Sequence, residues 1–112
     1  AGKLLAFHCG ADACERTHPL RIAKIARQFP ETQILCVHMG GVGFPDLSKA
    51  AIEMAQECPN LHLIGSMVNH QSVLEAIRSL GARRVCFGSD TPFALMHVCV
   101  ATYNALPSCF LL

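Results

Sequence analysis

The chain alternates short apolar runs with longer segments in which apolar positions recur every three or four residues. Four apolar runs, at residues 3–8, 33–38, 61–66 and 84–88, predict strands. Apolar residues follow one another within these runs, as expected for strands covered on both faces. Helical periodicity predicts helices over about 17–29, 45–58, 71–80 and 94–106. This alternation predicts an α/β domain with a parallel sheet and right-handed crossovers.

Each predicted strand runs into a polar residue. The four residues are His8, His38, Ser66 and Asp90, at successive spacings of 30, 28 and 24 residues. Because the carboxyl ends of parallel strands meet at one edge of the sheet, we expect these side chains to gather there. Side-chain alternation predicts that the residues two positions earlier lie directly below them, as the floor of a pocket. These floor residues are Ala6, Cys36, Ile64 and Gly88.

His8, His38 and Asp90 are the candidate catalytic and metal-binding residues. Two imidazoles and one carboxylate suit a divalent metal, Zn first, with Mn, Fe or Co as alternatives. Three protein ligands leave a position for a water molecule, and a nearby carboxylate can act as its general base. The alternative is structural: the histidines are satisfied by hydrogen bonds at strand ends, and Asp90 caps a helix that starts at Pro92.

The glycine-rich loop after His38 and two further histidines could also have functional roles. Gly40, Gly41 and Gly43 follow His38 and could let a substrate approach the backbone, although a plain tight loop explains them equally simply. His62 shares a strand face with Ser66, so it could line the interior. His70 lies in the polar loop before a predicted helix and could touch a substrate.

Composition limits the class of protein. A chain of 112 residues suits a single domain, and 52% hydrophobic with 15% charged residues is too apolar for disorder. The net charge of +1 with scattered basic residues argues against nucleic acid or an anionic membrane as partner. No apolar run approaches the ~20 residues of a membrane span. The start has no signal-peptide pattern, so we expect a cytoplasmic protein.

The seven cysteines show no C-x-x-C spacing. We interpret them as small buried side chains in a reducing compartment rather than as a zinc site. Cys9 is set apart from the others because it adjoins His8 at a strand end.

Four segments carry a resemblance to a known family. They are FHCG at 7–10, RQFPETQILCVHMGG at 27–41, PNLHLIGS at 59–66 and LGARRVCFGSDTPF at 80–93. Together they resemble the amidohydrolase-related (amidohydrolase 2) family, whose members are metal-dependent hydrolases and decarboxylases with a TIM barrel. The resemblance implies that the four strands are barrel strands 5 to 8. It also implies that His8 is the strand-5 metal ligand and Asp90 the strand-8 aspartate that binds metal and moves a proton. His38 then matches a histidine that binds metal in some members and polarises the substrate in others.

The sequence also departs from this family. The metal-binding H-x-H pair of strand 1 does not occur in the chain. We therefore expect residues 1–112 to form one domain, the (βα)4 carboxyl-terminal half of a TIM barrel. Its edge strands and inner face would need a partner, either a separate N-terminal half or a second copy of the chain.

Three functions follow as hypotheses. The first is hydrolysis of a C–N or C–O bond in a small molecule by a metal-dependent amidohydrolase-type enzyme that this chain completes only in part. Decarboxylation of a small carboxylic acid is the second. The third is a non-catalytic, truncated α/β domain that self-associates. A doubly wound binding domain is disfavoured, because the sequence carries no nucleotide-binding fingerprint.

Overall fold

Four parallel strands form a single sheet in the order β1-β2-β3-β4. In this computed structural model, which describes residues 2–9 and 13–110, each strand pairs with the next one along the chain. The strands are β1 (Leu4–Phe7), β2 (Gln33–Cys36), β3 (Leu61–Ile64) and β4 (Val85–Cys86). Sequential parallel neighbours joined by helices are the arrangement of consecutive units in a TIM barrel. The predicted (βα)4 half barrel is therefore confirmed.

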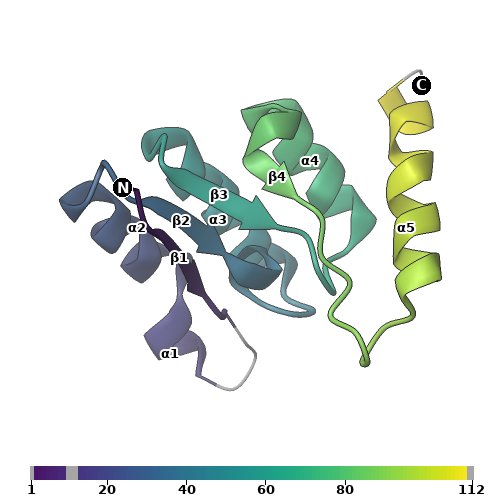
Figure 1. Cartoon of the computed structure of the whole chain (residues 1–112), viewed down its shortest axis with the longest axis horizontal. Coiled ribbons are helices and arrows are strands. Elements are labelled where there is room, and N and C mark those ends of the chain that lie inside the picture. The colour runs from purple at the N-terminus through teal and green to yellow at the C-terminus, as the bar shows by residue number, and fades with distance from the viewer. Residues whose placement is uncertain (1, 10–12, 111–112) are drawn as a thin grey trace.

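Helices cover one face of this sheet, as Figure 1 shows for α2, α3 and α4. The α-helices are α1 (Cys14–Thr17), α2 (Pro19–Gln28), α3 (Pro45–Glu57), α4 (His70–Leu80) and α5 (Met96–Ala105). Three 3-10 helices, η1 (Val37–Gly40), η2 (Ala82–Arg84) and η3 (Leu106–Phe110), complete the described elements. The predicted helices are present, and the short α1 was not anticipated.

Local sequence sets the ends of two helices. The Nδ1 atom of His18 accepts the Leu20 amide at 3.1 Å, and Pro19 occupies the first turn of α2. At α4, Asn69 Oδ1 accepts the Gln71 amide at 2.8 Å. Gly81, at φ 84°, follows α4 in the left-handed region that a side chain disfavours. These caps explain why periodicity located both helices well.

The core lies between the sheet and the helices. Ile34, Leu61 and Leu63 point from β2 and β3 into this layer and are buried, as are Ala23 and Val73 on the facing helices. A buried amide, Asn60, and a half-buried guanidinium, Arg84, tie loops to this layer. Asn60 Nδ2 donates to the carbonyl oxygens of Ala26, Phe29 and Thr32, and the Arg84 guanidinium donates to those of Ala55, Cys58 and Leu61.

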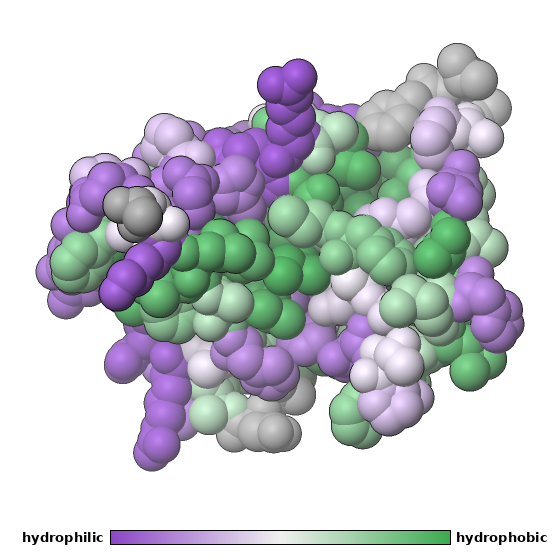
Figure 2. Space-filling view, in the orientation of Figure 1, coloured by the Kyte–Doolittle hydropathy of each residue, from purple (hydrophilic) through white to green (hydrophobic). Residues whose placement is uncertain are grey.

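The opposite face of the sheet is open: within residues 2–9 and 13–110, no helix packs on it (Figure 1). Leu4 at the free edge is 60% exposed, and Ala6 beside it is also exposed. Figure 2 shows hydrophobic surface gathered over the strands on this side. In a closed barrel this face would be the packed interior. Its exposure agrees with the predicted half-barrel architecture.

The last helix corrects one expectation. The sequence pattern predicted a helix over 94–106 and places Leu95, Val98, Cys99, Thr102 and Leu106 on one side of it. In the structure α5 has no buried residue, and Leu95, Val98 and Val100 are exposed. Only Leu106, just beyond the helix, is buried. Apolar residues are spread around this helix rather than gathered in one stripe, which is typical of a helix that is covered by further protein. Tyr103 nevertheless anchors it, through an edge-to-face contact with Phe87 and a 2.9 Å hydrogen bond to the Gly65 carbonyl oxygen.

Candidate active site

The predicted site residues follow the strands rather than ending them. The strands stop at Phe7, Cys36, Ile64 and Cys86, before the predicted ends. His8 comes directly after β1, while His38 lies inside η1 and Asp90 in an irregular segment after β4. All lie in segments that leave the carboxyl edge of the sheet, as expected for the functional edge of a parallel sheet.

The predicted pocket floor is wrong at one of its four positions. Cys36 pairs in register with Phe7 and Leu63 and is fully buried in the helix-covered layer. Ile64, in contrast, is in register with Cys86 on the open face. The prediction failed because β2 ends at Cys36. His38 lies in η1, so the side chains of Cys36 and His38 do not point to the same face of the sheet, as they would in a continuous strand.

The imidazoles of His8 and His38 lie side by side. Their ring centroids are 5.0 Å apart and the rings are perpendicular. His8 is exposed, whereas His38 is buried, with 2% of its surface accessible. The fold therefore brings together two candidate ligands that are 30 residues apart in the chain.

Ser66 orients the buried imidazole. The Nδ1 atom of His38 lies 2.9 Å from both the carbonyl oxygen and Oγ of Ser66. A carbonyl oxygen can only accept, so the first contact requires a proton on Nδ1. In the neutral tautomer with this proton, Nε2 carries the lone pair. Histidine ligands of metals are commonly held this way, with the second nitrogen donating to a carbonyl oxygen.

Backbone strain gathers at the same edge. The non-glycine residues with positive φ are His38 (57°), Met39 (45°), Met67 (54°) and Asp90 (61°) among the residues described. Each follows β2, β3 or β4. Residues with a side chain disfavour this left-handed backbone conformation. Residues that adopt it are held there by the surrounding structure, often at functional sites. The strain supports the placement of a site at the carboxyl ends of the strands.

Asp90 does not cap a helix. The segment after β4 continues without helix to Leu95, and α5 begins at Met96 without a side-chain cap. The structural alternative for Asp90 is therefore wrong.

The carboxylate of Asp90 is half-buried and forms no hydrogen bond or ion pair with the other residues that the structure describes. Across those residues, no three His, Cys, Asp or Glu side chains form a group that could hold a metal ion, so Asp90 does not close a three-ligand set with the two imidazoles.

Cys9 and Cys36 form a buried thiol pair. Their sulfur atoms are 3.5 Å apart, and both side chains are fully buried. The hydrogen bond from Cys36 lowers the pKa of Cys9, and the same contact, together with burial, raises the pKa of Cys36. The interpretation of the cysteines as buried side chains holds for this pair.

The remaining candidates lie outside the His8–His38 pair. His62 lies on the open face, where its Nε2 is 2.7 Å from Gln33 Oε1, and burial lowers its pKa. His70 is exposed at the start of α4. Gly40 has φ 95°, and a Cβ there would lie 2.8 Å from the Leu47 carbonyl oxygen. Tight packing therefore explains this glycine, which favours the plain-loop interpretation.

Sequence comparison decides the family. The family model described as amidohydrolase matches residues 2–101, nearly the whole chain. The chain belongs to the amidohydrolase family. The resemblance drawn from the four sequence segments is thus confirmed. None of the curated proteins matches the chain at a significant level.

Solved structures place this amidohydrolase-family chain in the TIM-barrel fold. An uncharacterised TIM-barrel protein from Bordetella bronchiseptica aligns with TM-score 0.75 and 23% identity, over 93% of this chain and 38% of its own. An amidohydrolase from Burkholderia multivorans with bound Zn aligns with a TM-score of 0.65 and 14% sequence identity, over 92% of this chain and 45% of its own. A 2,6-dihydroxybenzoate decarboxylase in complex with 2,6-dihydroxybenzoate aligns with a TM-score of 0.58 and 24% sequence identity, over 80% of this chain and 33% of its own. The chain therefore spans less than half the length of each of these proteins.

In the described residues, no helix is both long and apolar enough to cross a membrane.

Proposed function

We propose that this chain supplies the carboxyl-terminal half of the active site of a metal-dependent amidohydrolase-type enzyme that hydrolyses a C–N or C–O bond in a small molecule. The observation that carries the proposal is the arrangement of His38. Its Nδ1 is committed to Ser66, its ring meets the ring of His8, and its Nε2 is left as a lone-pair donor. This is the form in which an imidazole binds a metal ion.

The two imidazoles fit a divalent metal, and zinc is the first choice because zinc accepts imidazole and carboxylate ligands. The bound Zn of the Burkholderia multivorans amidohydrolase supports this choice, with Mn, Fe or Co as alternatives. When bound, such an ion supplies the positive charge that polarises a substrate carbonyl group and lowers the pKa of a water ligand to about 7. His8 and His38 would be two of the ligands, and the set would need further ligands.

Asp90 is the third residue of the proposed site. It follows the last strand at the same edge, and its carboxylate is not engaged by other described residues. We assign it the role of an additional ligand and of the base that takes and returns the proton of the attacking water. His38 either binds the metal or stabilises the negative charge that develops on the substrate oxygen.

Metal binding by purified chain tests this assignment. We expect the His8→Ala and His38→Ala variants to bind Zn²⁺ at least tenfold more weakly than the parent chain in calorimetric titrations, and Asp90→Asn to bind it more weakly by a smaller factor. His97→Ala is the matched control, because His97 is exposed on α5. Equal zinc binding by the parent chain, the site variants and the control would contradict the assignment.

Decarboxylation is the second candidate reaction. It is supported by the structural similarity to 2,6-dihydroxybenzoate decarboxylase. The same metal charge that would polarise a carbonyl can stabilise the carbanion-like charge that remains when CO₂ leaves. Assays of the completed enzyme against small aromatic carboxylic acids, with release of CO₂ as readout, separate this reaction from hydrolysis of amides and esters.

A partner that covers the open face is part of the proposal. Leu4 at the free edge, the open face of the strands and the apolar α5 are the surfaces that need cover. We propose either a separate N-terminal half barrel or a second copy of the chain. Sedimentation of the purified chain distinguishes them, since self-association gives a concentration-dependent dimer. A monomer at all concentrations, with no binding to an added N-terminal half from a family member, would contradict both.

A further inference from the structure

Two hydroxyl groups flank Asp90 in the segment after β4. Ser89 Oγ and Thr91 Oγ1 are 3.0 Å apart, and the backbone amide of Thr91 donates to Ser89 Oγ at 3.4 Å. The Thr91 hydroxyl also donates to the carbonyl oxygen of Ala94, at 3.4 Å. Because that contact uses its single proton, the Ser89 hydroxyl is the donor to Thr91 Oγ1. Ser89 and Thr91 therefore form a hydroxyl bridge that links the two neighbours of Asp90.

The hydroxyl bridge is attached to the rest of the fold through Ser89. This serine is buried, with 7% exposure, whereas Thr91 is exposed. The thiol of Cys99 on α5 donates to the Ser89 carbonyl oxygen over 3.9 Å. On the other side, the carbonyl oxygen of Asp90 accepts the amide of Phe93 at 2.9 Å. The backbone is thus held both before and after Asp90.

The backbone conformation of Asp90 requires such support. Its φ of 61° lies in the left-handed region, which is unfavourable for a residue with a side chain. Aspartate reaches this conformation more readily than most residues, and it persists where neighbouring contacts hold it. The carboxylate makes no hydrogen bond or ion pair within the part of the chain that the structure describes. The contacts therefore fix the main chain of Asp90 and leave its carboxylate free.

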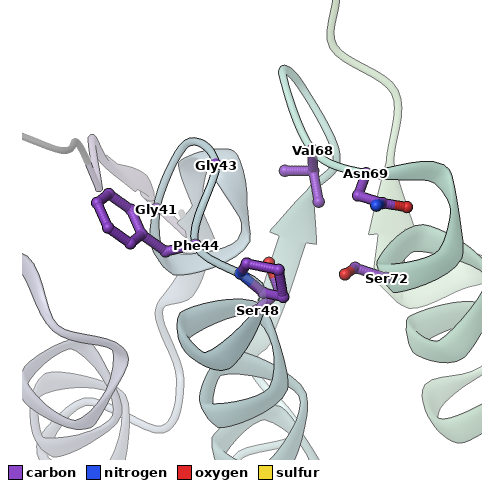
Figure 3. Close-up of a pocket in the computed structure, with 8 residues that line it drawn as sticks. Gly41, Gly43, Phe44, Ser48, Val68, Asn69 and Ser72 are labelled. Carbon is purple, nitrogen blue, oxygen red and sulfur yellow. The ribbon is translucent and has the colours of Figure 1, made fainter.

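The neighbouring segments supply no second carboxylate. The segments that follow β2 and β3, residues 37–44 and 65–69, contain neither Asp nor Glu. The pocket between these segments is lined by uncharged residues (Figure 3). In the segment that follows β4, residues 87–95, Asp90 is the one acidic residue. The direction of this single side chain therefore decides where these three segments present negative charge.

We infer that Ser89 and Thr91 are positioning residues, which hold Asp90 in the left-handed conformation and so set the direction of its carboxylate. The inference rests on the proposed function only for the role of Asp90, because the backbone conformation can be measured without a metal. Loss of the hydroxyl bridge lets Asp90 relax to negative φ, which turns the carboxylate in another direction.

Three-bond NMR couplings across the N–Cα bond of Asp90 report its φ and test the inference in the isotope-labelled chain. We expect left-handed values in the parent chain. In Ser89→Ala and in Thr91→Val, the ratio of left-handed to extended conformers should fall at least about fivefold, the factor that corresponds to one lost hydrogen bond. Thr91→Ser keeps the hydroxyl and should retain the parent couplings. Thr102→Val is the matched control, because it removes an exposed threonine hydroxyl of α5.

Zinc titration separates this inference from the proposed function. If Asp90 contributes to zinc binding, Ser89→Ala should weaken binding by the parent chain and cause no further loss when combined with Asp90→Asn. A parent chain that binds no zinc but shows the expected couplings in all variants contradicts the metal site and supports the positioning role.

Two results overturn the inference. One is a negative φ at Asp90 in the parent chain, and the other is parent-like couplings in both Ser89→Ala and Thr91→Val. Thr91→Val alone decides if Ser89→Ala does not fold, since Thr91 is exposed and valine has its shape.

Discussion

The imidazole of His38 is held from one side by Ser66, through two contacts of 2.9 Å between Nδ1 and the Ser66 carbonyl oxygen and Oγ. Both residues are buried, His38 at 2% and Ser66 at 4% exposure. The ring is therefore fixed by the segment that follows the neighbouring strand, and Nε2 remains available. The segment that follows β3 therefore sets the orientation of the imidazole that follows β2, which is the imidazole proposed to bind the metal.

Replacing Ser66 by alanine tests this link. Ser66→Ala removes the hydroxyl contact and keeps the carbonyl contact, so we expect a loss of about 1 kcal/mol in the free energy of unfolding, measured by urea denaturation. Ser79→Ala, which removes an exposed serine of α4, should change it by less than about 0.5 kcal/mol. Equal stabilities of the two variants would show that Ser66 Oγ does not support the imidazole.

Gly88 leaves room for the same serine. A Cβ at this position would lie 2.7 Å from Ile64 Cγ2 and 2.9 Å from Ser66 Cβ. We expect Gly88→Ala to destabilise the fold by about 1–3 kcal/mol through overpacking, and to shift the ring resonances of His38 because Ser66 must move. Gly2→Ala is the control, since nothing lies within 4 Å of its added Cβ. Unperturbed His38 resonances in a folded Gly88→Ala chain would argue against this coupling.

Asn60 joins three carbonyl oxygens across a loop. Its Nδ2 lies 3.1 Å from Ala26 O, 3.0 Å from Phe29 O and 2.9 Å from Thr32 O. Asn60→Ala should therefore cost about 2 kcal/mol in the free energy of unfolding. Asn60→Asp should cost more, because it turns a carboxylate oxygen toward acceptors. Asn104→Ala, at an exposed position on α5, serves as the control, and a ranking in which Asn60→Asp is the mildest variant would refute the interpretation.

Tyr103 makes stability depend on alkaline pH. Burial raises its pKa to about 12, from an ordinary value of 10.0 that applies in the unfolded chain. Both states keep the phenol proton below pH 10, so the contribution of Tyr103 is fully present there. Between pH 10 and 12 the unfolded chain loses this proton first, and the folded state is destabilised relative to it by on the order of 1 kcal/mol, allowing for partial exposure.

Comparison with Tyr103→Phe isolates this effect. The variant loses the hydrogen bond to Gly65, so it should be less stable by about 1 kcal/mol at pH 8. Its disadvantage should shrink as the pH rises from 10 to 12, because it lacks the group that titrates. A stability difference that stays constant over this range, measured by thermal unfolding at each pH, would count against a buried phenol.

The sequence by itself determined the order of strands and helices and the edge of the sheet at which the candidate site residues lie. Continuous apolar runs and helical periodicity are local properties, so they located the four strands and most of the helices. Caps such as His18 and Asn69 reinforced the helix starts. The HMGG and FGSDTPF motifs identified the family, because they combine candidate ligands with the loops that follow them.

Only the tertiary structure decided which of these residues meet. The pairing of His8 with His38, the support of His38 by Ser66 and the separation of Asp90 from a three-ligand set depend on where each strand ends. The strand β2 ended early because η1 begins at Val37 and the backbone turns to positive φ at His38, a choice that hydrophobic patterning does not encode. The exposure of α5 was equally hidden, since apolar periodicity reports which residues prefer burial and not whether a covering surface is present.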